Sequence, residues 1–268
     1  MVSAMREERF VLEQLTVRVH AYGRIEPGIT DSLREIGILD LPSYCERKNT
    51  SVEEVLGRLG YLSPQIGFLL LQLNAPKILV GYDKTPAVLG FLEPTFTATF
   101  LGTKIKRRKE NFLYGTKILT HRNFVNQIII SAKLGSKVVL IPLHLDDLTT
   151  SYEIKLRGLG TEICYISIDE YPIQIPKNVL GVDDYRKLLV RYASMLDALI
   201  FGLEKRIADF SRDFTNEEKV STPIESSIEA FGIHILNEES FVRFFIDAYL
   251  ELKAIRSTLK RTINNIQS

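Results

Sequence analysis

The most distinctive candidate site is a basic stretch between residues 101 and 125, where seven lysines and arginines accompany a single acidic residue. Four consecutive basic residues, 106–109, precede two aromatic side chains. Cations neutralise backbone phosphates and aromatic rings stack on bases, so the stretch predicts a nucleic-acid-binding surface. A solvated lysine-rich loop at a sheet edge is the alternative. The predicted surface consists of Lys104, Lys106, Arg107, Arg108, Lys109, Phe112, Tyr114, Lys117 and Arg122.

A second candidate site is formed by acidic residues and a histidine that follow predicted strands. Ligands of open parallel sheets bind just outside the carboxyl ends of the strands. Asp83, Asp146 and Asp169 stand at such positions, and carboxylate oxygens are ligands that Mg²⁺ prefers. His144, with Asp146 and Asp147, is a candidate catalytic group because an imidazole can move a proton. The alternative is that these carboxylates only cap the following helices.

Motifs for other common reactions are absent from the sequence. It contains no glycine-rich phosphate loop, no nucleophile elbow and no zinc-protease motif. Cys45 and Cys164 are too far apart in the sequence to form a local metal or redox pair. Glu153 and Lys155 have the spacing of one nuclease class, which needs them on a strand, whereas we expect a helix there. We therefore expect no cofactor, with Mg²⁺ as the alternative.

Alternating strands and helices are expected to position these residues. The expected elements are a strand at 77–82, a helix at 123–134, a strand at 137–142, a helix at 148–159 and a strand at 162–168. Glycine stands at or just beyond the end of each expected helix, which is typical of helix termination. The repeat predicts βαβ crossovers, hence an α/β fold with a mainly parallel sheet. Alternating residues 95–100 predict an antiparallel ribbon inserted into it.

The N-terminal segment combines one expected strand with two expected helices. Residues 15–21 alternate between apolar and polar, which favours a strand over a helix. Ser51 and Glu54 have capping-box spacing and predict a helix over 51–59. A second helix is expected at 63–73. Its apolar composition predicts a core helix instead of one that reads DNA bases.

Two long helices are expected in the C-terminal part, where apolar residues recur at steps of three and four over 185–210 and 241–266. Such helices can pack on each other, or on a partner protein or a second copy. We favour packing within the chain. The expected organisation is an N-terminal segment 1–75 that packs on the sheet, an α/β core 76–180 and a long-helix part 181–268.

Composition limits the classes of protein that the chain can belong to. It has 268 residues, 45% of them hydrophobic, and a formal net charge of +1, which is typical of a globular protein. No apolar run approaches the roughly 20 residues that a membrane-spanning helix needs. The N-terminus has no secretory signal pattern. We therefore expect a cytoplasmic protein without a membrane partner.

One short segment has a slight resemblance to a known family. Residues 123–135, with Gln127 and the closing Lys133, Leu134 and Gly135, resemble the guide-end helix of Argonaute middle domains. The resemblance covers that segment alone and implies contact with a guide nucleic acid. Together with the basic stretch, it predicts a non-catalytic subunit that binds nucleic acid or a nucleic-acid-handling protein, such as an accessory subunit of a guided defence complex. The alternative is a Mg²⁺-dependent phosphoryl or nucleotide enzyme or nuclease.

Overall fold

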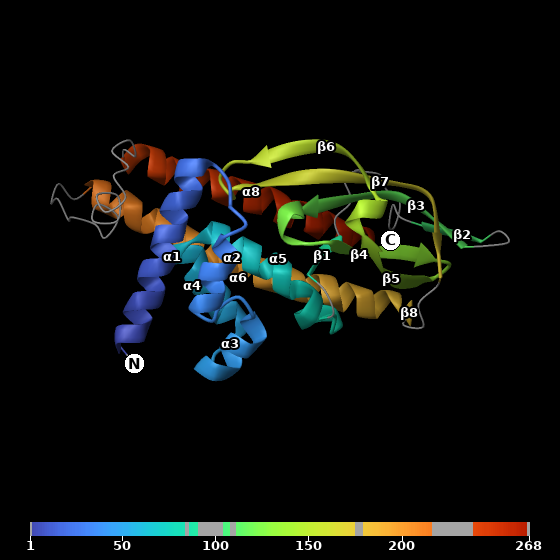
Figure 1. Ribbon diagram of the computed structural model, residues 1–268, viewed down its shortest axis with the longest axis horizontal. Helices are drawn as coiled ribbons and strands as arrows, with labels where there is room; N and C mark the ends of the chain where they lie inside the picture. Colours follow the sequence, from blue (N-terminus) through green and yellow to red (C-terminus); the bar gives the residue numbers. More distant parts are fainter. Residues whose placement is uncertain are drawn as a thin grey trace. The chain divides into compact units, whose positions relative to one another are not determined.

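The computed structural model describes residues 2–83, 86–90, 104–107, 111–174, 179–215 and 238–266. The chain forms two compact units, each built from segments that are distant in the sequence. The first unit comprises Met1–Leu71, Leu156–Thr161 and Met195–Ala254, and the second comprises Gln72–Lys155, Glu162–Ser194 and Ile255–Ser268. Figure 1 shows the helices and strands along the chain.

The N-terminal part is helical from its first described residue. Its helices are α1 (Val2–Tyr22), α2 (Ile29–Glu35), α3 (Leu41–Lys48), α4 (Val52–Leu62) and α5 (Pro64–Val80). The strand expected at 15–21 is therefore wrong, because these residues belong to α1. The second half of α1 is buried on several sides, so both Thr16 and Val17 are buried. A helix that is buried on several sides has apolar residues on more than one face. Some of them are then two residues apart, which is the spacing typical of a strand.

The two helices expected at 51–59 and 63–73 are confirmed as α4 and α5. The predicted capping box is present, since Ser51 Oγ accepts from the Glu54 N–H and the Glu54 carboxylate accepts from the Ser51 N–H. The strand expected at 77–82 is wrong, because α5 continues to Val80. The apolar residues of this segment form the last turns of the helix. A short apolar run is compatible with either a buried strand or a buried helix, so the sequence did not distinguish them.

Within the described residues the sheet has eight strands, and most neighbouring strands are antiparallel. They are β1 (Ala87–Gly90), β2 (Lys104–Arg107), β3 (Asn111–Thr120), β4 (Gln127–Leu134), β5 (Lys137–His144), β6 (Thr149–Leu156), β7 (Thr161–Ile173) and β8 (Val179–Leu180). The order is β6-β7-β3-β2-β4-β5-β8, with β1 paired to β4. Only the β1–β4 and β2–β4 pairings are parallel among those with a described register. The fold is thus α/β with a mixed sheet, and the mainly parallel prediction is wrong.

Two misread segments explain this error. The helices expected at 123–134 and 148–159 are mostly strands, β4 and β6, so the helix implied by the Argonaute resemblance is absent from this segment. Gly135 (φ +62°) and Gly160 (φ +60°) lie in the turns after these strands. A tight hairpin and a helix terminus both need positive φ, so glycine alone does not distinguish them. The strands expected at 137–142 and 162–168 are confirmed as β5 and β7, and the ribbon at 95–100 lies outside the described residues.

Apolar side chains of the sheet form the core of the second unit. Its members include Ile128 of β4, Val139 of β5 and Ile166 of β7, all fully buried. β4 is buried along most of its length, so its apolar residues are continuous instead of alternating. This continuity is the reason that the strand resembled a helix in the sequence.

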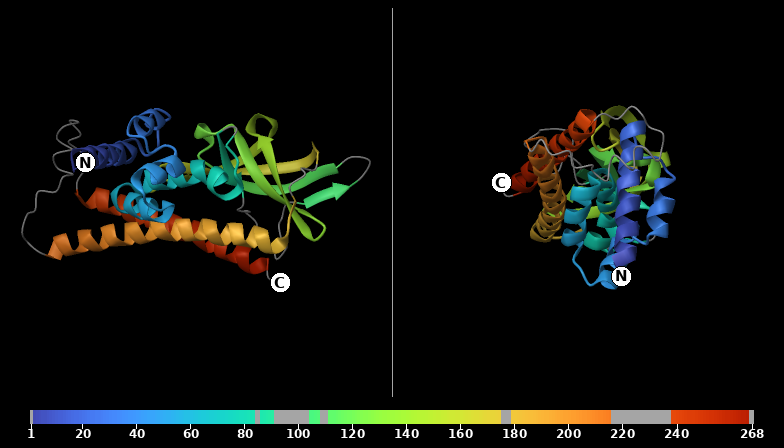
Figure 2. Two further views of the ribbon diagram at one scale, coloured as in Figure 1. Left: turned by 90° about the horizontal axis from the view of Figure 1, so that it is seen from below. Right: turned by 90° about the vertical axis from the view of Figure 1, so that its left-hand side faces the viewer.

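The two expected C-terminal helices are confirmed as α6 (Val182–Thr215) and α8 (Glu238–Asn265). They lie side by side in Figure 2, and in the first unit the rings of Phe210 and Phe245 have centroids 5.5 Å apart. Glu204 of α6 binds both Tyr249 and Lys253 of α8. The apolar stripe of α8 is buried, with Leu252 fully enclosed, so the predicted packing within the chain is confirmed.

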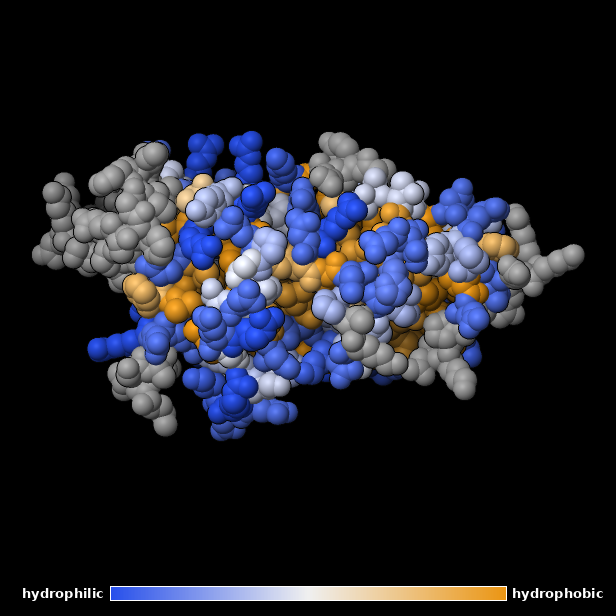
Figure 3. Space-filling model, viewed as in Figure 1, coloured by the Kyte–Doolittle hydropathy of each residue, from blue (hydrophilic) through white to orange (hydrophobic). Residues whose placement is uncertain are grey.

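The surface follows the usual distribution of polar and apolar side chains. The face shown in Figure 3 is largely hydrophilic, and apolar side chains are visible mainly between hydrophilic ones. None of the helices in the described part of the chain is long and apolar enough to cross a bilayer.

Candidate functional site

Polar side chains gather at one end of the sheet, where β3 and β5 end and β4 begins. The Tyr82 hydroxyl donates to Oε1 of Gln127, and Nε2 of Gln127 lies 2.8 Å from Nε2 of His144. Since an amide nitrogen can only donate, Gln127 donates and Nε2 of His144 accepts in this contact. We call Tyr82, His121, Arg122, Gln127 and His144 together the polar end.

Strand register explains why Gln127 meets His144. The two residues are directly opposite each other in the antiparallel β4–β5 pair. Opposite residues in such a pair project their side chains from the same face, close enough to touch. The sequence correctly identified His144 as a strand-end residue, but it gave no sign of its partner, because Gln127 was assigned to a helix.

His121 is the second unusual group of the polar end. It follows β3 with φ +56°, is only 2% exposed, and its ring contacts the edge of Phe124. Burial lowers the pKa of His121 to about 3, so the imidazole is uncharged at neutral pH. Left-handed backbone at a residue other than glycine is uncommon and clusters at functional sites. No sequence pattern indicated this conformation.

Only some of the predicted nucleic-acid-binding residues lie in the described part of the chain, and they differ in exposure and contacts. Lys106 is exposed, with its ammonium 4.4 Å from the ring centre of Tyr114, and Tyr114 in turn donates to Glu170. Arg122 is exposed and donates to Thr150 Oγ1. Phe112 is half-buried on β3. Arg108 and Lys109 lie outside the described residues, as do the side chains of Lys104 and Arg107 on β2.

Lys117 contradicts the predicted surface directly, because its side chain is fully buried. Its ammonium donates to Ser131 Oγ at 3.3 Å, and the Tyr185 hydroxyl donates to the same oxygen at 2.8 Å. A buried ammonium of this kind cannot reach a phosphate and requires hydrogen bonds inside the protein. Lys117 therefore joins strands to α6 within the second unit, and its assignment to a nucleic-acid site is wrong.

Two of the carboxylates predicted to follow strands have other positions, since Asp83 follows helix α5 and Asp169 lies within β7. Asp83, Asp146 and Asp169 are exposed, and no group of three His, Cys, Asp or Glu side chains in the described ranges could hold a metal ion. The predicted Mg²⁺ site is therefore wrong. Asp147 accepts a hydrogen bond from Tyr171 at 3.2 Å, and burial, helped by this contact, raises the pKa of the Tyr171 phenol. Asp146 and Asp147 lie in a short 3₁₀ turn instead of capping a helix.

Comparisons with known proteins define the class of this architecture. No protein-family model matches the chain, and no curated protein matches it in sequence. Solved structures do match, and those with substantial similarity include acyl-CoA dehydrogenases. The chain therefore has an acyl-CoA dehydrogenase-like fold.

Three of these structures show the extent of the likeness. Acyl-CoA dehydrogenase from Geobacillus kaustophilus has a TM-score of 0.61 at 13% identity, over 97% of this chain and 77% of that one. Glutaryl-CoA dehydrogenase from Mycobacterium smegmatis, in complex with FADH2, has a TM-score of 0.60 at 13% identity, over 98% of this chain and 88% of that one. The prolyl acyl carrier protein oxidase AnaB has a TM-score of 0.60 at 14% identity, over 96% of this chain and 78% of that one. At these identities, what is shared is the fold.

This likeness overturns the functional predictions made from the sequence. The matching structures are dehydrogenases and an oxidase, so the predicted non-catalytic subunit for nucleic acid, including the guided-defence role, is wrong. The alternative Mg²⁺-dependent nuclease or phosphoryl enzyme is wrong for the same reason. Nucleic acid as the partner does not agree with these neighbours. The expected absence of a cofactor and the alternative of Mg²⁺ are also wrong, because one neighbour is a complex with FADH2.

Proposed function

We propose that this chain is an FAD-dependent oxidoreductase that acts on an acyl thioester. The observation that carries the proposal is the fold, which matches acyl-CoA dehydrogenases over 95–98% of this chain. One match contains FADH2, another contains glutaryl-CoA, and a third is an oxidase named for an acyl carrier protein substrate. The cytoplasmic location expected from the sequence is part of the proposal.

The polar end fits the chemistry of a flavin. The isoalloxazine ring is uncharged in its oxidised form and needs hydrogen-bonding groups near its ring nitrogens. Gln127 and the exposed His144 are such groups at this end of the sheet, whereas the buried imidazole of His121 does not reach a bound ring. The exposed guanidinium of Arg122, one residue later, has the charge that a pyrophosphate needs. We therefore assign flavin binding to this end of β3.

The roles of these residues follow from their contacts. Bound flavin supplies the capacity to accept a hydride. Gln127 and His144, which hold each other at neighbouring strand ends, would form hydrogen bonds to the ring, and the left-handed backbone of His121 shapes the turn that carries Arg122. Arg122 is exposed and donates to Thr150 Oγ1, which holds the guanidinium at this end of the sheet, where its charge would meet the pyrophosphate.

FAD binding tests this proposal. We expect the purified chain to bind FAD with the absorbance bands of protein-bound flavin, and acyl-CoA thioesters to bleach them. Arg122→Gln should weaken FAD binding about tenfold through loss of a charge-assisted bond. Arg243→Gln, an exposed arginine of α8, is the control and should have no effect. Failure to bind FAD at micromolar concentration would refute the proposal, and parallel assays with acyl-CoA and acyl carrier protein thioesters would identify the carrier.

A further inference from the structure

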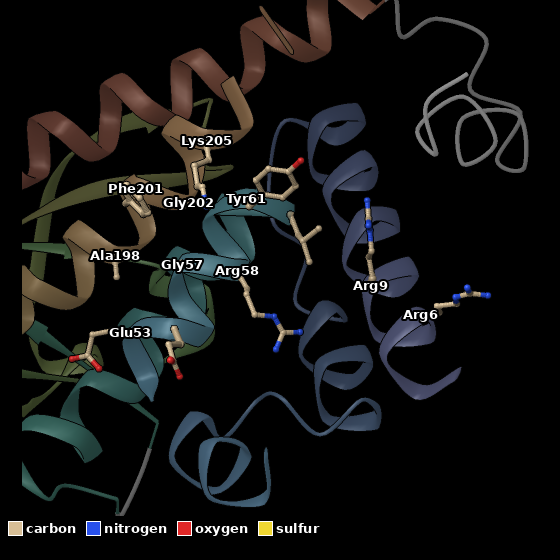
Figure 4. Close-up of a pocket in the computed structure, with 12 residues that line it drawn as sticks. Arg6, Arg9, Glu53, Gly57, Arg58, Tyr61, Ala198, Phe201, Gly202 and Lys205 are labelled. Carbon is tan, nitrogen blue, oxygen red and sulfur yellow. The ribbon is translucent and has the colours of Figure 1, made fainter. Parts of the chain in front are cut away.

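A groove of about 800 Å³ runs along the exposed side of α4 in the first unit, between α1 and α6 (Figure 4). Its volume lies within the range of about 300–1,000 Å³ typical of small-molecule sites. None of its lining residues belongs to the polar end. The lining residues are Arg6, Arg9, Glu53, Glu54, Gly57, Arg58, Tyr61, Leu62, Ala198, Phe201, Gly202 and Lys205.

The groove exists because small residues form its floor. Gly57 and Gly202 meet where α4 contacts α6, and Ala198 lies beside them. A Cβ on Gly202 would lie 1.9 Å from the Gly57 carbonyl oxygen, so the two backbones are in direct contact. Without side chains at these positions, nothing fills the space above the helices. The hollow is therefore a consequence of close helix packing.

One wall of the groove is apolar and fixed in place. Phe201 is 61% exposed although it is a large apolar side chain. Tyr61 is held by a hydrogen bond from its hydroxyl to Asp209 and by Arg206, whose guanidinium lies 5.2 Å from its ring centre. Ordered aromatic surface open to water is a feature of binding sites, because a ligand that covers it gains the hydrophobic free energy.

The rim of the groove is mainly cationic. Arg58 and Arg9 are paired with Glu8 and Glu13, whereas Arg6 and Lys205 have no carboxylate partner within the described ranges. Of the two lining carboxylates, that of Glu54 is already engaged in the capping box of its own helix. In Figure 4, Arg6 and Arg9 rise from α1 and Lys205 from α6, on opposite walls. An anion in the groove would therefore meet unpaired positive charge.

We propose that this groove binds an amphiphile with a linear alkyl chain and an anionic head group. The alkyl chain lies over Gly57 and covers Phe201, and the head group meets Arg6 or Lys205 at the rim. The proposal does not depend on flavin binding, since all of its residues belong to the first unit and the polar end belongs to the second.

Titration calorimetry of the full chain with decanoate, decyl phosphate and decanol tests the proposal. We expect both anions to bind with one site per chain and decanol to bind about tenfold more weakly. Comparing the two anions shows whether a carboxylate or a phosphate head is preferred. Affinity should fall as salt is added, because the rim charges are exposed. Equal binding of decanol, or no binding of either anion, would overturn the proposal.

Matched variants locate the binding. Phe201→Ala should weaken decanoate about tenfold, since the covered ring is lost, and Leu250→Ala, equally exposed on α8, is its control. Arg6→Gln with Lys205→Gln should also weaken it, with Arg243→Gln and Lys260→Gln as the charge control. Gly57→Leu should fill the floor, because its Cβ meets only the Ala198 oxygen at 3.6 Å. Equal losses in the controls, or dissociation of a dimer by Phe201→Ala in light scattering, would overturn the proposal.

Discussion

Among the ionisable residues of the first unit, Glu251 on α8 has an unusual environment. Its carboxylate accepts N–H bonds from Gly158 at 3.2 Å and Leu159 at 2.8 Å, in the turn between β6 and β7. Burial raises the pKa of Glu251 to about 7, and the neighbouring charge of Asp247 adds to this, although the backbone bonds act in the opposite direction. Desolvation thus outweighs hydrogen bonding at this residue.

The raised pKa predicts a stability that depends on pH. A carboxyl that holds its proton more tightly in the folded chain favours folding below its unfolded pKa of 4.5, and this contribution is lost as the pH rises to about 7. We expect the free energy of unfolding to fall by about 1–2 kcal/mol across this range, after allowance for partial exposure. Glu251→Gln should remove that fall in urea titrations, and exposed Glu239→Gln should retain it. A fall of unchanged size in Glu251→Gln would contradict the assignment.

At the scale of elements, glycines set the distance between α4 and α6. A Cβ on Gly60 would lie 2.0 Å from the Leu199 carbonyl oxygen, and one on Gly202 would be equally close to Gly57. Glycine normally weakens a helix by about 1 kcal/mol relative to alanine. Glycine is nevertheless required at these positions, because any larger residue would prevent direct contact between the backbones of α4 and α6.

Two alanine substitutions at this contact should therefore have opposite effects. Gly202→Ala should destabilise the chain by about 1–3 kcal/mol, because overpacking outweighs the gain in helix propensity. Gly57→Ala is the matched control, since its Cβ has ordinary contact at 3.6 Å with the Ala198 oxygen. We expect it to be neutral or to stabilise by up to about 1 kcal/mol. Similar melting temperatures for the two variants would show that the helices do not approach so closely.

At the scale of the whole molecule, three helices contribute residues to both units. α5 continues from the first unit into the second after Leu71, α6 passes from the second into the first at Met195, and α8 passes back after Ala254. Residues of one continuous helix share its hydrogen-bond ladder and form cooperatively. We therefore expect the chain to unfold as one cooperative system.

A charge in the buried stripe of α8 tests this expectation. Leu252 is fully buried, so Leu252→Asp introduces an unpaired charge and should destabilise the chain by about 3–5 kcal/mol. The effect should appear in calorimetry as a shift of a single transition. Exposed Leu250→Asp, two residues earlier, is the control and should have little effect. Two transitions, of which only one moves, would show that the units unfold independently.

The sequence by itself determined the elements whose signals are local. The capping box at Ser51 and the apolar steps of α6 and α8 lie within single helices, so their positions could be predicted. The apolar segment of β5 and the first part of β7 were also recognised. His144 was found as a strand-end residue for the same reason. Each of these features depends on neighbours a few residues away along the chain.

The tertiary structure alone decided what depends on pairing and enclosure. β4 is buried along most of its length, so its sequence does not alternate between apolar and polar residues. Gly135 follows this strand with a positive φ that is equally typical of the end of a helix. The Gln127–His144 contact requires the β4–β5 register, and the burial of Lys117 requires strands and a helix around it. The groove joins α1 and α4 to α6, which follows more than a hundred residues later. The spacing of apolar residues predicts a helix or a strand only where one face of the element is buried and the other faces water. Segments that are buried on both faces, such as β4, do not have this pattern.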